Sequence, residues 1–142
     1  MKKEVLIQIK GNQKTVEDSD FIELTTVGNL YKKNEHYYLK YEESEATGFE
    51  GAVTTLKVEG QDKVTLTRSG SVRSQLIVEK GIRHLCHYDT GYGEMVIGIF
   101  GESIRSTLKD TGGRLHFKYT LDVNTGFESE NEISILVKQC GS

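Results

Sequence analysis

The chain has 142 residues, of which 27% are charged and 36% hydrophobic, a composition typical of one folded domain and not of a disordered chain. Its 18 basic and 21 acidic side chains give a formal charge of −3, which argues against nucleic acid as a partner. The sequence lacks both a secretory signal and the ~18 consecutive apolar residues of a membrane span. Because the chain has only two cysteines, we expect a cytoplasmic protein with reduced thiols. Its length predicts a single domain over residues 1–142.

Apolar and polar residues alternate along most of the chain, in segments that glycine-containing turns separate. A period of two residues indicates a β-strand with one buried side and one solvent-facing side. In chain order the pattern predicts about ten strands, at 4–10, 21–30, 37–42, 52–58, 63–67, 72–79, 95–99, 104–108, 114–123 and 133–137. Residues 82–88 are also interpreted as a strand. Residues 103–109 also fit about one and a half turns of helix.

The succession of strands predicts how they assemble. Proline is absent, and no segment of ten or more residues has a convincing helical period. Consecutive antiparallel strands must pair or close, because open edges promote aggregation. We therefore predict an all-β fold, a single antiparallel meander that closes as an up-and-down barrel of about eight to ten strands. The interior of such a barrel holds packed side chains or one small ligand.

Four segments, in this order, resemble a known family: YEESEATGFEGAVTTLKVEG, VTLTRSGSVRSQLIVEKG, YDTGYGEM and GGRLHFKYTLDVN. They are similar to the YwiB-like family of small bacterial proteins of unknown function, over about residues 4–137. The resemblance implies a calycin-like (lipocalin-like) β-barrel. Calycin barrels bind small hydrophobic or amphipathic molecules in the lumen. Because the family has no established reaction, the resemblance assigns no catalytic residue.

The stretch HLCHYDTGYGEM, residues 84–95, is the one region whose side chains suggest chemistry. In a strand, however, His84 and Cys86 share one side and His87 lies on the other, so one ion cannot reach both histidines. A structural zinc needs four ligands and a catalytic zinc three, while a Cys–His nucleophile pair needs a third, orienting group. We therefore predict no metal, no cofactor and no catalytic residue. The DTG at 89–91 is interpreted as a hairpin turn and not as an aspartic-protease motif.

Arg68 is the most informative polar residue, because it continues the inward phase of Val64 and Leu66. A guanidinium in an apolar interior needs a carboxylate, a ligand anion or water. Two interpretations stay open: Arg68 pairs with a surface acid at the barrel mouth, or it anchors the acidic group of a ligand. Acidic side chains and tyrosines, which have an apolar ring and a polar tip, complete the predicted ligand-binding set. The set consists of Arg68, Tyr41, Glu43, Tyr88, Tyr92, Glu94 and Tyr119.

The predicted barrel is compatible with two functions from different classes. The first is non-enzymatic binding of a small amphipathic or acidic molecule in the barrel lumen. The second is a homo-oligomeric assembly module, such as a homodimer, whose barrel is filled by its own side chains. An enzyme is the least favoured function, because no pair of residues has a spacing that requires catalysis.

Overall fold

The computed structural model describes residues 2–43, 50–71, 73–89, 93–124 and 126–140, and within these ranges the chain forms ten β-strands. The strands are β1 (Lys3–Lys14), β2 (Ser19–Lys33), β3 (His36–Glu42), β4 (Ala52–Glu59), β5 (Lys63–Gly70), β6 (Ser74–Glu79), β7 (Arg83–Asp89), β8 (Glu94–Ser106), β9 (Gly112–Val123) and β10 (Gly126–Gln139). None of the described segments forms a helix that is long and apolar enough to cross a membrane.

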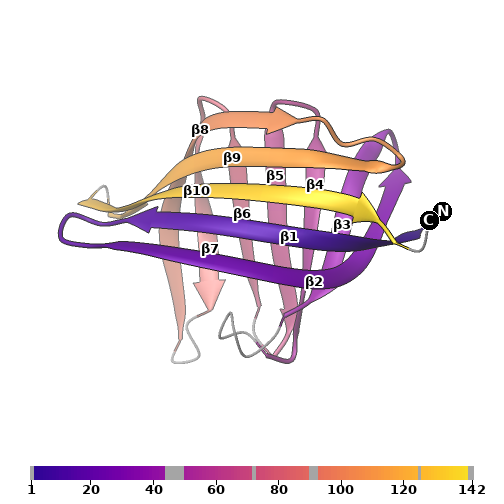
Figure 1. Cartoon of the computed structure of the whole chain (residues 1–142). Helices are drawn as coiled ribbons and strands as arrows, with labels where there is room; N and C mark the ends of the chain where they lie inside the picture. Colours follow the sequence, from indigo (N-terminus) through magenta and orange to yellow (C-terminus); the bar gives the residue numbers. More distant parts are fainter. Residues whose placement is uncertain (1, 44–49, 72, 90–92, 125, 141–142) are drawn as a thin grey trace.

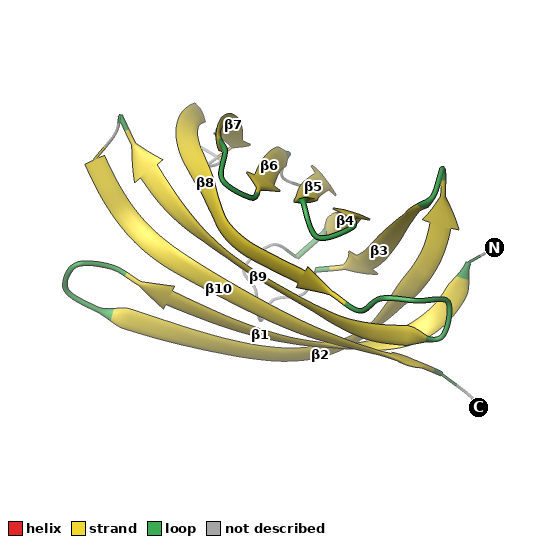
Figure 2. Ribbon diagram, turned by 90° about the horizontal axis from the view of Figure 1, so that it is seen from above, coloured by secondary structure: helices red, strands yellow, loops and turns green. Residues whose placement is uncertain are grey.

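The strands form a closed ring in which each one pairs antiparallel with its neighbours in the sequence. The ring closes between β1 and β10, where Val5 lies opposite Gln139 and Lys14 lies opposite Glu130. Figure 1 shows β1, β2, β9 and β10 running across β4–β7, and Figure 2 shows β1 and β2 on the side of the barrel opposite β7. The predicted antiparallel meander that closes as a barrel is confirmed, while kinship with the calycins stays a prediction.

Strand β8 differs from the sequence prediction, because it joins segment 95–99 to the first part of segment 104–108 and ends at Ser106. The register between β8 and β9 shifts between Gly101 and Ser103. A β-bulge of this kind inserts one residue. Ile99 and Ile104 are therefore both buried, although they are five positions apart, a spacing that would place them on opposite faces of a regular strand. The helical alternative for 103–109 is wrong, since Ser103 and Ile104 pair with β9.

The core is built from the inward-facing side chains of all ten strands. Core residues on well-separated strands are almost inaccessible to solvent, as in the case of Val5, Leu39, Ile99 and Phe117. Burying side chains of this size contributes about 1.5–3 kcal/mol apiece. The alternation pattern places these residues inward because successive side chains of a strand point to opposite faces of the sheet.

Candidate functional site

The barrel interior contains a cavity of about 200 Å³. Most of its wall is aliphatic, with side chains such as Leu56, Val64 and Ile135. Four polar side chains interrupt this wall: Tyr41 and Glu43 from β3 and its end, Arg68 from β5, and Tyr119 from β9. The cavity therefore combines an apolar body with a small group of polar side chains, which is the usual composition of a small-molecule site.

Arg68 reaches the cavity because of its position in β5. It lies opposite Thr54 of β4, and both side chains follow the inward phase of their strands. The end of β5 is held by Ser71, whose hydroxyl donates a hydrogen bond to the backbone carbonyl of Glu50 at 2.9 Å. At Gly70 the backbone φ is 106°, and a Cβ atom there would lie 2.5 Å from the carbonyl oxygen of Gly51. Only glycine allows this close approach of β5 to the start of β4.

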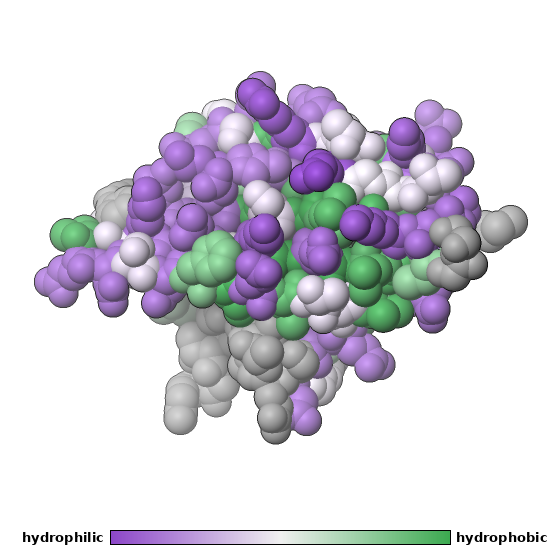
Figure 3. All heavy atoms as spheres, viewed as in Figure 1, coloured by the Kyte–Doolittle hydropathy of each residue, from purple (hydrophilic) through white to green (hydrophobic). Residues whose placement is uncertain are grey.

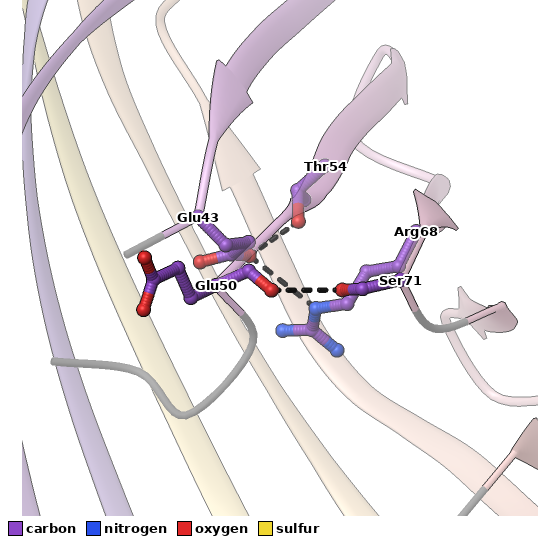
Figure 4. A network of polar contacts seen from close by, with 5 residues as sticks. All are labelled: Glu43, Glu50, Thr54, Arg68 and Ser71. Atoms are coloured by element: carbon purple, nitrogen blue, oxygen red, sulfur yellow. Dashed lines mark hydrogen bonds and ion pairs between the residues drawn. The ribbon is translucent and has the colours of Figure 1, made fainter. Parts of the chain in front are cut away.

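Glu43, Thr54 and Arg68 form a hydrogen-bonded network beside the cavity (Figure 4). The Nε atom of Arg68 lies 3.3 Å from Oε2 of Glu43, and the hydroxyl of Thr54 donates to the same oxygen. The Glu43 side chain is 1% exposed and that of Arg68 is 14% exposed. Arg68 thus lines the cavity and is paired with a buried acid, Glu43. A buried carboxylate needs such partners, because burial of an unpaired charge is strongly unfavourable.

Tyr41 is 8% exposed and lies next to this network. Burial is the largest cause that raises the pKa of Tyr41, and the negative charge of Glu43 adds to it. The positive charge of Arg68 acts in the opposite direction but is the smaller influence. The phenol therefore stays protonated in the folded protein at a pH at which an ordinary tyrosine ionises.

We expect Tyr41 to contribute to alkaline instability. Its pKa is raised in the folded state above the ordinary value of 10.0, so the neutral form is favoured by folding. The contribution to stability is complete below about pH 10 and is lost as pH rises above this value, because the unfolded chain releases the proton first. Ultraviolet titration at pH 11 counts the ionised tyrosines in the unmodified protein and in Tyr41→Phe. The two folded proteins should give the same count, whereas in urea the variant should have one ionised tyrosine fewer. An equal loss of one in both states would contradict the raised pKa.

Tyr119 lines the cavity from the opposite wall. Its ring stacks on Phe117, with the ring centroids 6.2 Å apart. The structure therefore brings Tyr41, Glu43, Arg68 and Tyr119 of the predicted set around one cavity. The other three residues of the set are Tyr88, Tyr92 and Glu94. Tyr92 lies outside the residues that the structure describes, as do the side chains of Tyr88 and Glu94.

The His84–Asp89 stretch lies in strand β7, as the alternation predicts. Nε2 of His84 lies 2.8 Å from Oε1 of Glu79, and the sulfur of Cys86 accepts a hydrogen bond from the backbone N–H of Ile77 at 3.3 Å. Burial raises the pKa of the Cys86 thiol, which disfavours the nucleophilic thiolate. Within the described ranges, no group of three or more His, Cys, Asp or Glu residues is arranged to hold a metal ion.

Sequence reasoning missed Thr54, which is fully buried and holds the Glu43 carboxylate. A signal was available, because Thr54 continues the inward phase of Leu56 and Val58 in an otherwise apolar row. A hydroxyl on an apolar strand face predicts a buried polar partner. The identity of that partner depends on strand pairing, which alternation within one strand does not reveal.

Comparisons with known proteins give a consistent result. A family described as "Domain of unknown function (DUF1934)" matches residues 7–135. The chain is 29% identical over 126 residues to the uncharacterized β-barrel protein YwiB of Bacillus subtilis (strain 168), an alignment that covers 89% of this chain and 81% of YwiB. The crystal structure of the Bacillus subtilis YwiB protein matches the fold with a TM-score of 0.86, covering 99% of this chain and 94% of that one at 24% identity.

Proposed function

The chain belongs to the DUF1934 family, and we propose that it is a non-enzymatic binding protein for a small amphipathic molecule held in the barrel lumen. This membership confirms the resemblance to the YwiB-like family drawn from the sequence. The observation that carries the proposal is the cavity of about 200 Å³ with Glu43 and Arg68 in its wall. A barrel filled by its own side chains would leave no such space, so the cavity favours ligand binding over the self-filled alternative.

The volume of the cavity limits the size of the ligand. An apolar protein cavity of about 150 Å³ holds a benzene molecule, whereas drug-sized ligands occupy roughly 300–1,000 Å³. A cavity of about 200 Å³ is therefore suited to a single ring or a short chain, on the order of ten non-hydrogen atoms. The aliphatic wall would receive the body of such a molecule.

The polar residues limit its chemistry. The Arg68 guanidinium meets Glu43 through Nε and lines the cavity. A guanidinium presents its donors as a planar fork that matches a carboxylate. We infer a ligand with an acidic group directed at Arg68 and an apolar body directed at the aliphatic wall. The role of Glu43 is then to hold the guanidinium in place and to balance its charge in the ligand-free protein.

A thermal-shift panel tests this proposal. We expect short-chain and monocyclic carboxylic acids, such as hexanoate and benzoate, to raise the melting temperature by mass action on the folded state, by about 9 °C at 100 times the dissociation constant. The matching alcohols and amines should shift it less. Leu66→Phe, which adds volume to the cavity wall, should abolish the shift, whereas Thr67→Phe on the outer face of the same strand should retain it. A panel without any shift would refute lumen binding, and a preference for amines would refute the acidic class.

A further inference from the structure

One outer face of the barrel carries hydrophobic side chains that the fold does not bury. They belong to β6, β7 and β8, and we refer to them as the β6–β8 face: Ile77, Leu85, Val96 and Phe100. Leu85 is 66% exposed, Val96 46% and Phe100 39%, while Ile77 is half-buried. Soluble monomers rarely expose a contiguous group of large apolar side chains without a binding role.

Strand pairing makes these side chains neighbours. Leu85 lies opposite Gly98, between the β8 positions of Val96 and Phe100, and all three side chains point away from the lumen. Ile77 follows on β6, next to β7, where its backbone N–H bonds the thiol of Cys86. Figure 2 shows β7 and β8 side by side on the side of the barrel away from β1 and β2.

An ion pair crosses the middle of this face. The Nη2 and Nε atoms of Arg83 lie 2.6 Å and 2.9 Å from the two carboxylate oxygens of Asp122 on β9. The pair passes directly over Gly98, where a Cβ atom would lie 2.4 Å from Nη2 of Arg83 and 2.6 Å from Oδ1 of Asp122. Glycine at position 98 therefore lets the guanidinium lie flat among the hydrophobic side chains, with its charge balanced within the same chain.

A second outer face, on β2, also carries exposed hydrophobic side chains, among them Phe21, which is 61% exposed. Its surroundings are charged. The β9–β10 surface carries the ion pair Lys118–Glu130 and the polar contact between His116 and Glu132, both at 2.7 Å. Figure 3 shows this side of the molecule, where charged side chains surround a group of hydrophobic ones. Val27 of β2 is 50% exposed there. Position 27 therefore provides a matched exposed hydrophobic residue on a different face.

We propose that the β6–β8 face binds the same face of a second copy of this chain, as a two-fold symmetric dimer. In such an interface each residue meets its own counterpart or a neighbour, so the face must be complementary to itself. A face with unbalanced charge would repel its own copy. Here Arg83 is balanced by Asp122 within the chain, and the flanking residues Leu85, Val96 and Phe100 are apolar. A flat arginine among aliphatic and aromatic side chains also matches the composition of interface centres.

The size of the face predicts how strong the dimer is. Three strands spaced about 4.8 Å apart, over some seven residues each, cover roughly 300–400 Å². A standard interface buries about 800 Å² on each partner. The dimer should therefore be reversible, with a dissociation constant on the order of 10–100 μM, which lies at the weak end for specific interfaces.

Sedimentation velocity at about 1 μM and about 300 μM tests the proposal, since these concentrations lie on either side of the expected dissociation constant. The unmodified chain should change from monomer to dimer across this range. Leu85→Glu, which places a like charge on both copies, should raise the dissociation constant at least tenfold, and Val96→Glu should do the same. Val27→Glu on the other face should leave it unchanged. Melting curves at 1 μM serve to select variants that remain folded.

Two results would overturn the inference. The first is an unmodified chain that stays monomeric at 300 μM, which needs no variant for its interpretation. The second is a dimer that Val27→Glu dissociates while the two β6–β8 variants retain it, because the second copy would then occupy the β10–β1–β2 face.

Discussion

Replacing Arg68 by methionine is expected to lower the free energy of unfolding by about 3–5 kcal/mol, the usual consequence of removing one partner of a buried ion pair. The substitution retains most of the aliphatic stem and leaves the Glu43 carboxylate, which is 1% exposed, without its guanidinium. Urea denaturation at pH 7 measures the loss as a lower midpoint at an unchanged slope.

Two further variants separate the charge from the packing. Arg105→Met removes an arginine from an exposed position of β8 and should change stability by no more than about 0.5 kcal/mol, as most surface substitutions do. The double variant Arg68→Met with Glu43→Leu removes both charges and should recover most of the loss, because replacing a buried pair by apolar residues is often neutral. If the double variant is as unstable as Arg68→Met alone, the loss of unfolding free energy comes from packing of the arginine stem and not from the unpaired charge.

Phe117→Ala is expected to lower stability by about 3–5 kcal/mol, through lost burial and the space left behind. Phe117 is 2% exposed, lines the lumen cavity and stacks on Tyr119. Phe100→Ala is the matched control, because the same side chain is 39% exposed on the outer face. Measured by urea denaturation at about 1 μM, where the proposed dimer is dissociated, the control should lose less than about 1 kcal/mol. Equal losses at both positions would show that the barrel interior is not the main source of stability.

Alternation alone was sufficient to predict that the Arg68 side chain points inward. A period of two residues assigns each side chain to one face of its strand, and one face of a closed barrel is the lumen. The same reasoning placed Cys86 and His87 on opposite sides of their strand, in agreement with a buried Cys86 and an exposed His87. These predictions succeed because they depend only on positions within a single strand.

The features that escaped prediction depend on more than one strand. The bulge at Gly101 is a mismatch between β8 and β9, and within β8 alone it resembles a break between two short strands. The bond from Thr54 to Glu43 requires the register of β3 against β4. The volume of the cavity depends on how side chains from eight strands pack together, which no local pattern records.

The pairing of β1 with β10 also determines when this protein can finish folding. Val5 meets Gln139, so the first strand of the barrel keeps one edge unpaired until its last strand has been synthesised. Contacts between residues so distant in sequence are slow to form, and an unpaired strand edge is prone to aggregation in the meantime. Synthesis of the final strand is thus the step that turns an open, vulnerable sheet into a barrel without edges.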